Sequence, residues 1–236
     1  MIRKLLRLVY PPKCIFCDTI VENDRFAVCS ECMREMPENQ RACAVCGTPL
    51  DTVYGPLLCT ACAKRRRPFQ RAYVPFVYKD AVRSSILGFK FGGKRARAVT
   101  FAAYILLKMR ELEAKRPDVI TFVPLHFIRL GKRGYNQSAL LAKALGGMLG
   151  VPVLPLLRKK RHTPPQSKQR KRERQNALRD AFVFRKKADI RGKHILLIDD
   201  VITTGATLSA CARVLRKNGA VRIEIATIAA TPYAAK

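Results

Sequence analysis

The sequence lacks long hydrophobic runs. No apolar stretch approaches the roughly 18 residues that a membrane-spanning helix requires, so we expect no transmembrane segment. The N-terminus starts with basic residues, but its apolar part is too short and too interrupted for a signal peptide. We therefore expect a cytoplasmic protein, with Ile2–Val9 forming a short amphipathic helix against its body.

Acidic residues are also scarce. The 236 residues include 17 Asp and Glu against 46 Lys and Arg, which gives a formal net charge of +29. A positive field of this size favours polyanionic partners, namely nucleic acid, an anionic membrane surface or a highly phosphorylated small molecule. The length allows one main domain and a small appendage.

Cysteine, by contrast, is abundant and regularly spaced. Eight of the nine cysteines form four Cys-x-x-Cys pairs: Cys14/Cys17, Cys29/Cys32, Cys43/Cys46 and Cys59/Cys62. The two thiolates of such a pair can bind one metal ion, and two pairs complete a closed tetrahedral site. We predict two structural Zn²⁺ sites in adjacent ribbons formed by sequential pairs. Pairing of the first knuckle with the third is the alternative.

Other readings of the cysteines are less favoured. A disulfide framework is disfavoured because the chain has no secretory signal, and a closed thiolate shell leaves no open position for metal catalysis. The ninth cysteine, Cys211, is expected to be a small buried apolar side chain. The basic run Lys64–Arg67 and Pro68 mark a boundary between residues 1–67, the zinc-ribbon module, and residues 68–236, the main domain.

One stretch of the main domain carries the strongest functional pattern. The apolar run Ile195–Ile198 predicts a buried parallel strand, which ends in Asp199 and Asp200. Thr203–Thr207 then lead into a predicted helix over Leu208–Lys217. Hydroxyls, a glycine and the free N–H groups of a helix N-terminus suit a phosphate. Two carboxylates beside this cradle suit a sugar phosphate, because they can accept hydrogen bonds from ribose hydroxyls.

The remaining pattern predicts an α/β fold with a five-stranded, mainly parallel sheet and flanking helices. Further strands are expected at Tyr73–Tyr78, Asp118–Pro124, Val151–Leu157, Ala181–Phe184 (pairing back as a hairpin) and Val221–Ile228. Further helices are expected at Asp80–Phe89 with Asp80 as its cap, at residues 96–113 and at Gln137–Leu149. Lys90 precedes two glycines and is a candidate to reach the ligand, although a solvated lysine is the more common case.

These motifs resemble a known family. The Asp-Asp and Thr-Thr-Gly-Ala-Thr pattern is similar to the phosphoribosyl pyrophosphate (PRPP) signature of type I phosphoribosyltransferases. With the cysteine pairs, PLHxxRxxxRGYNQS and RxTPPQ, it resembles the ComF (GntX) family. The resemblance implies the type I phosphoribosyltransferase fold after a double zinc ribbon, with PRPP and Mg²⁺ as ligands. It also implies a role in natural competence, with single-stranded DNA and competence proteins as partners.

The resemblance also implies which residues form the PRPP site. They are Asp199 and Asp200 for the ribose, Thr203, Thr204, Gly205, Ala206 and Thr207 for the 5′-phosphate, Leu125, His126, Arg129 and Arg133 for the pyrophosphate, and Arg161, Thr163 and Gln166 on a closing loop. The segment after the strand at Asp118–Pro124 is expected to be a basic loop, and the run Arg158–Arg174 a long mobile one. Asp199, Asp200 and Arg161 are the candidate catalytic residues. For His126, a hydrogen bond to the backbone is the structural alternative.

Two functions follow from this pattern. One is a PRPP-binding protein that handles single-stranded DNA, and the alternative is an active phosphoribosyltransferase of nucleotide or base salvage whose acceptor is unknown. For DNA, the surplus charge lies at Arg65–Arg67 and Arg158–Arg174. The nearby aromatic residues Phe69, Tyr73, Phe76 and Tyr78 are candidates for stacking on bases.

Overall fold

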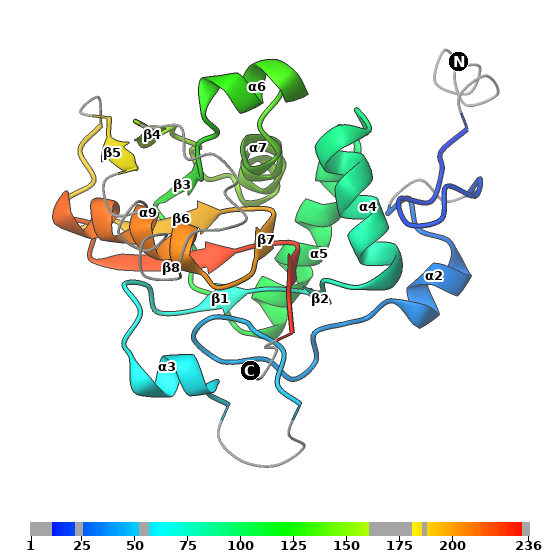
Figure 1. Cartoon of the computed structure of the whole chain (residues 1–236), viewed down its shortest axis with the longest axis horizontal. Coiled ribbons are helices and arrows are strands. Elements are labelled where there is room, and N and C mark those ends of the chain that lie inside the picture. The colour runs from blue at the N-terminus through cyan, green and yellow to red at the C-terminus, as the bar shows by residue number, and fades with distance from the viewer. Residues whose placement is uncertain (1–10, 22–25, 52–56, 161–180, 186–187, 233–236) are drawn as a thin grey trace, which may run out of the picture.

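A computed structural model of the chain describes residues 11–21, 26–51, 57–160, 181–185 and 188–232 (Figure 1). The helix expected at Ile2–Val9 and the closing-loop residues Arg161, Thr163 and Gln166 lie outside these ranges. Among the helices in the described ranges, none has both the length and the apolar character needed to cross a membrane.

A four-stranded parallel sheet forms the centre of the protein. Its order is β1 (Ala72–Tyr73), β8 (Arg222–Ala226), β6 (His194–Ile198) and β3 (Val119–Phe122). The strand predicted at Ile195–Ile198 is confirmed as the central β6. Its register places Ile198 beside both Phe122 and Ala226, so the ends of these strands meet at one edge of the sheet.

The expected fifth core strand at Val151–Leu157 is reduced to a single parallel bridge between Val153 and Ile120. Pro152 and Pro155 explain the difference, because neither has an N–H to donate to a continuous ladder. The chain instead forms β4 (Leu157–Lys159), which pairs antiparallel with β5 (Phe182–Phe184). The hairpin predicted at Ala181–Phe184 is confirmed, whereas Arg158 and Lys159, predicted in the mobile loop, belong to a strand.

A second, three-stranded parallel sheet continues from the central one. Its order is β2 (Phe76–Val77), β9 (Ala229–Ala230) and β7 (Val201–Ile202). The single strand predicted at Tyr73–Tyr78 is therefore wrong, because the chain leaves the central sheet after β1 and enters the second sheet at β2. Pro75, which has no N–H, lies at this break. β6 and β7 are divided in the same way, and Asp199 and Asp200 occupy the division.

In the described part of the chain, five helices flank the sheets: α4 (Asp80–Phe91), α5 (Arg97–Glu111), α6 (Phe127–Arg133), α7 (Gln137–Leu149) and α9 (Ala206–Lys217). The helices predicted at Asp80–Phe89, residues 96–113, Gln137–Leu149 and Leu208–Lys217 are all present. However, Asp80 is not the cap of α4, since the N-cap is Lys79 and Asp80 has a φ of 46° inside the first turn. The basic loop expected after β3 is largely α6, which His126 caps and which ends at Gly134 in the left-handed conformation.

Both faces of β6 are covered. Leu196 and Ile198 are buried in an apolar core with residues of α4, α5 and α7, while Ile195 and Leu197 are buried in a second core with residues of α9. This double coverage explains the continuous apolar run in the sequence.

The cysteine-bearing segments pack against the same two cores. The first segment, which includes α2 (Ser30–Glu35), contributes Cys14 to the core of α4 and α5. The second, which includes α3 (Thr60–Lys64), contributes Cys43, Cys46 and Cys59 to the core of α9. α2 and α3 lie on opposite sides of the view in Figure 1, so each cysteine cluster contacts a different part of the main domain.

Candidate functional site

Two adjacent carboxylates lie at the end of β6, where the two sheets divide. Asp199 Oδ1 accepts hydrogen bonds from Ser138 Oγ at 2.9 Å and from the backbone N–H of Asp200 at 2.9 Å. Asp200 Oδ1 lies 2.8 Å from the Nζ of Lys90 on α4. The neighbouring strands therefore place the acids, while α7 and α4 supply their partners.

The two acids differ in their ease of ionisation. Burial and the nearby charge of Asp200 together raise the pKa of Asp199 to about 7. The hydrogen bonds from Asp200 N–H and Ser138, and the charge of Lys90, oppose this rise but do not cancel it. Asp199 thus exchanges its proton near neutral pH, and a cationic ligand would favour its ionised form.

A pocket beside these acids contains the predicted phosphate-binding residues. Asp199 and residues 201–208 line it, so the threonines, Gly205 and Ala206 of the predicted cradle come together with one of the acids. Gly205 is the N-cap of α9 and has a φ of 69°, a backbone conformation that few residues other than glycine adopt. The N-terminus of this helix, with its dipole, is suited to an anion.

Several cations surround the acids. Burial lowers the pKa of Arg133, and the charge of Asp200 opposes this effect. Burial also lowers the pKa of Lys159, which interacts with Arg129 and Asp199. The structure therefore brings Arg133, which was predicted, into the field of Asp200, and places Arg129, also predicted, close enough to interact with Arg133 and Lys159. The sequence analysis did not predict Ser138 or Lys159 as site residues, because only tertiary packing brings them to β6.

The beginning of α6 serves mainly to fix the backbone. His126 is buried, and its Nδ1 accepts a hydrogen bond from Ile128 N–H at 3.4 Å. Its ring lies 4.3 Å from that of Phe127. The geometry therefore matches the structural alternative for His126. Leu125 is half-buried directly before it, and a pyrophosphate role for these two residues stays a prediction.

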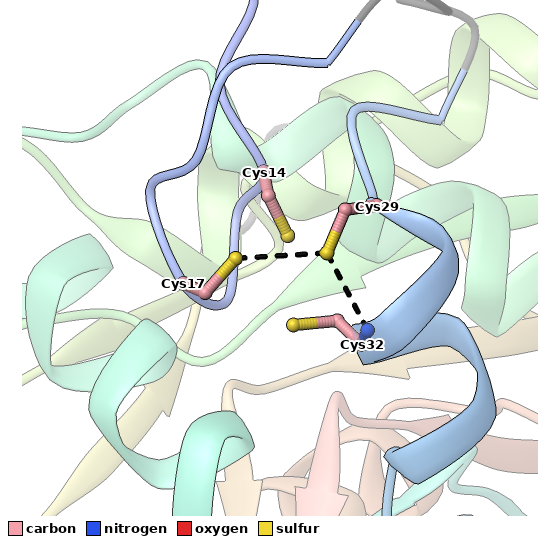
Figure 2. Close-up of side chains that lie close together, drawn as sticks. All are labelled: Cys14, Cys17, Cys29 and Cys32. Atoms are coloured by element: carbon pink, nitrogen blue, oxygen red, sulfur yellow. Dashed lines mark hydrogen bonds between the residues drawn. The ribbon is translucent and has the colours of Figure 1, made fainter.

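The eight paired cysteines form two clusters with zinc-site geometry. One cluster consists of Cys14, Cys17, Cys29 and Cys32, whose side chains point towards a common centre (Figure 2). The other consists of Cys43, Cys46, Cys59 and Cys62. Within each cluster, all Sγ atoms lie within 4.8 Å of one another. The clusters confirm the sequential arrangement of pairs.

The sulfur spacing fits a zinc ion. The Cys17 and Cys29 sulfurs are 3.6 Å apart, as are those of Cys46 and Cys59. Four sulfurs at a Zn–S distance of about 2.3 Å in a tetrahedron would be roughly 3.8 Å from one another. A disulfide is much shorter, at about 2.05 Å, and the nine cysteines are free thiols in the structure. Cys211 is buried in the core of α9, as predicted.

Three of the four aromatic residues predicted to stack on DNA are not available for stacking, and the fourth, Tyr78, is half-buried. Phe69, Tyr73 and Phe76 are 3%, 1% and 1% exposed, because they fill the cores beneath the sheets. Among the described residues, the exposed aromatic side chains are instead Phe91, at 67%, and Phe127, at 74%. Phe91 is the last residue of α4 and Phe127 is the first residue of α6, next to the cations of the site.

Comparison with known proteins assigns the chain to a family. The family described as "Phosphoribosyl transferase domain" matches residues 102–236, and the family described as "Double zinc ribbon domain" matches residues 5–63. The chain is 30% identical over 225 residues to DNA utilization protein YhgH of Escherichia coli K12, covering 92% of this chain and 96% of that protein. Competence protein F of Haemophilus influenzae is 29% identical over 219 residues, with coverage of 90% and 94%.

Two further matches cover less of the chain. Competence protein ComFC of Bacillus subtilis is 29% identical over 199 residues, covering 81% of this chain and 79% of that protein. Among solved structures, adenine phosphoribosyltransferase from Thermoanaerobacter pseudethanolicus matches 64% of this chain and 74% of its own, with a TM-score of 0.38 and 21% identity. With its two cysteine clusters and its phosphoribosyl transferase domain, the chain belongs to the ComF family.

Proposed function

We propose that the protein binds PRPP in the pocket at the start of α9. The observation that carries this proposal is the convergence of Asp199 with the 203–207 loop in one pocket, with Lys90, Arg133 and Lys159 nearby. The acids would accept hydrogen bonds from the ribose hydroxyls, and the loop would hold the 5′-phosphate. The cations would face the negative pyrophosphate.

The site also fits Mg²⁺, which commonly binds one or two carboxylates together with substrate phosphates. Asp199 and Asp200 are adjacent carboxylates with this chemistry, and when bound the ion would neutralise part of the diphosphate charge. Arg129 and Arg133, on α6, would stabilise a leaving pyrophosphate. We place this activity in the cytoplasm and in DNA uptake, in keeping with the relatives named competence proteins.

The test is PRPP binding measured by calorimetry in the presence of Mg²⁺. We expect the wild type to bind, and the double variant Asp199→Asn, Asp200→Asn to lose binding while keeping its fold. The matched control is Asp189→Asn, which removes an exposed carboxylate paired with Arg191. Unchanged affinity in the double variant would place the PRPP site elsewhere. Pyrophosphate release on addition of purine or pyrimidine bases would identify the alternative function, a salvage transferase.

A second function, single-stranded DNA binding, is favoured by the surface around Phe91 and Phe127. The guanidinium of Arg133 lies 4.6 Å from the centre of the Phe91 ring, and that of Arg95 lies 4.6 Å from the Tyr135 ring. Exposed Lys132 lies on the same short helix as Phe127. Exposed aromatic rings among cations suit a single strand, since the rings stack on bases while the cations contact phosphates.

A fluorescence-anisotropy titration of a labelled oligonucleotide tests this second function. We expect the logarithm of affinity to fall linearly with the logarithm of salt concentration, with a slope of about −0.7 per phosphate contacted. Phe127→Ala with Lys132→Glu should weaken binding about tenfold or more. The charge control is Arg110→Glu, an exposed residue near the end of α5 that precedes the start of β3. Equal losses of DNA affinity in the double variant and in Arg110→Glu would mean that non-specific charge alone accounts for the binding.

A further inference from the structure

One side chain joins the second cysteine cluster to the phosphate-binding loop. The Nε of Arg67 donates to Cys62 Sγ at 3.5 Å, and its Nη1 donates to the carbonyl oxygen of Thr204 at 3.2 Å. Arg67 and Thr204 are 137 residues apart in the sequence. A single guanidinium, with its planar fork of donors, therefore contacts both a zinc ligand and the backbone of the candidate phosphate site.

The backbone around Arg67 is fixed by the main domain. Arg216, in the last turn of α9, donates from its Nε to the Pro68 carbonyl at 3.1 Å. Gln70 exchanges two hydrogen bonds with Ile223 of β8, each 2.9 Å long. Arg67 is half-buried, whereas Arg66 in the same basic run is exposed. These contacts hold Arg67 against α9 and distinguish it from the solvated cations beside it.

The contact with Thr204 has a consequence for the orientation of the loop. In a trans peptide the carbonyl group and the following N–H point in opposite directions. Because Arg67 holds the Thr204 carbonyl on its own side, the N–H of Gly205 is directed away from Arg67. A side chain at Gly205 would have its Cβ 3.5 Å from Arg67 Nη1, so the guanidinium lies directly against the turn that begins α9.

We propose that Arg67 is a positioning residue that couples the second zinc site to the phosphate loop. Zinc-bound thiolates carry negative charge, so a filled site would hold the guanidinium by a charge-assisted hydrogen bond from Nε to Cys62. Nη1 would then keep the peptide between Thr204 and Gly205 in the orientation that leaves its N–H for a bound phosphate. This inference rests on the proposed function of the pocket in binding PRPP.

The coupling has a reciprocal consequence. If a filled zinc site raises the affinity for PRPP, then bound PRPP must stabilise the filled zinc site by the same factor. An arginine that only neutralised the thiolates would influence metal retention without changing the phosphate loop. The two roles therefore differ in what removal of the guanidinium does to residues 203–207.

The experiment compares Arg67→Ala with Arg66→Ala, which removes the same charge from the same run. Both variants should keep two zinc ions per chain, because all eight thiolates remain. For Arg67→Ala we expect PRPP affinity, measured by calorimetry with Mg²⁺, to fall about tenfold. A loss of this size is typical when one hydrogen bond from a charged donor, here that of Arg67 to Thr204, is removed. Hydrogen exchange at the amides of residues 203–207 should become faster. PRPP should slow zinc transfer to a chromogenic chelator in the wild type and in Arg66→Ala, but not in Arg67→Ala.

The outcomes separate this inference from the proposed function. Equal PRPP affinity and equal amide exchange in the two variants would overturn the coupling while PRPP binding stood. Loss of one zinc ion from Arg67→Ala would also overturn it, by making Arg67 a structural part of the metal site. If the wild type did not bind PRPP, the proposed function would fail, and amide exchange at residues 203–207 alone would decide whether Arg67 positions the loop.

Discussion

Lys90 on α4 forms an ion pair with Asp200, with 2.8 Å between Nζ and Oδ1, and their side chains are only 18% and 16% exposed. Lys90 lies before residues 102–236, which match the phosphoribosyl transferase domain. A segment upstream of the matched region therefore supplies a charge to the acidic pair. Lys90 was a candidate to reach the ligand because two glycines follow it in the sequence. These glycines lie after the end of α4, and Gly92 is the C-cap of that helix.

Replacing Lys90 by methionine should shift the pH dependence of PRPP binding upwards. The charge of Lys90 lowers the pKa of Asp199, so its removal leaves the two acids to repel each other and raises that pKa above its present value of about 7. Calorimetry with PRPP and Mg²⁺ across the neutral pH range would show the shift, together with an affinity about tenfold lower at neutral pH. Lys143→Met, on the exposed face of α7, is the control. Identical pH midpoints in the two variants would show that Lys90 does not act on the acids.

Asp199→Asn should stabilise the free protein at alkaline pH. The pKa of Asp199 in the folded protein, about 7, lies above its ordinary value of 3.8, so the folded state binds the proton more strongly. Ionisation therefore destabilises the fold progressively as pH rises from 3.8 to about 7, and fully above that. Asparagine removes this effect, and its Oδ1 can still accept from Ser138 and from the Asp200 N–H.

Thermal unfolding of Asp199→Asn at several pH values would check this sign. At about pH 8 the variant should melt higher than the wild type, by roughly 2–4 °C for each kcal/mol relieved, and the difference should disappear near pH 4. A variant that is less stable than the wild type at alkaline pH would contradict the raised pKa. If Asp199→Asn is instead the more stable protein at alkaline pH, Asp199 is costly to stability yet needed for PRPP, as functional carboxylates often are.

The sequence predicted the parts of the site that are local in the chain. A buried strand, two acids, a threonine-rich turn and a helix follow one another within His194–Lys217. Hydrophobic periodicity and local composition were therefore sufficient to predict this part of the site. The cysteine pairs were predicted for the same reason. Ser138, Lys159 and Arg67 could not be assigned this way, because each reaches the site or its loop only after segments distant in sequence pack together.

The errors have local physical causes. Pro75 lies where the predicted strand Tyr73–Tyr78 divides between two sheets, and two prolines limit Val151–Leu157 to a bridge. The basic residues at 129–133 indicated a loop, although His126 and Gly134 provide the cap and the stop of a short helix. Phe69, Tyr73 and Phe76 were predicted to be available for stacking, because the sequence alone does not show which faces of a sheet other elements cover.

The protein purified without added zinc should contain close to two zinc ions per chain. Two clusters of four cysteines, with all Sγ atoms in each within 4.8 Å, provide the sites. Elemental analysis would give the ratio, and titration of free thiols after denaturation and chelation should find all nine cysteines reduced. Removal of both ions with a strong chelator should lower the melting temperature, since structural zinc contributes directly to folding. Intact disulfides in place of metal would contradict the prediction.

Glu224→Gln should destabilise the protein at neutral pH and much less in acid. Glu224 is 1% exposed, and its carboxylate accepts from Tyr73 Oη at 3.0 Å and from Arg222 Nη2 at 2.7 Å, with His194 Nε2 at 3.0 Å. Burial alone would raise the pKa of Glu224, but the hydrogen bonds from His194, Arg222 and Tyr73 outweigh it and lower the pKa to about 2. The ionised form is thus favoured by folding.

The sign of the pH effect follows from this lowered pKa. Because the folded value lies below the ordinary 4.5, the stabilisation is fully present above about pH 4.5 and is lost as the pH falls towards 2. Its size is about 3 to 4 kcal/mol at most, from roughly 1.4 kcal/mol for each pKa unit. Urea unfolding at neutral pH and near pH 3 should show the difference between wild type and Glu224→Gln shrinking in acid. The control is Glu111→Gln, whose carboxylate is 59% exposed beside Lys108 and, as an exposed partner, should contribute little at any pH. A constant difference between Glu224→Gln and the wild type at both pH values would mean that lost packing, and not the carboxylate charge, sets the stability of this cluster.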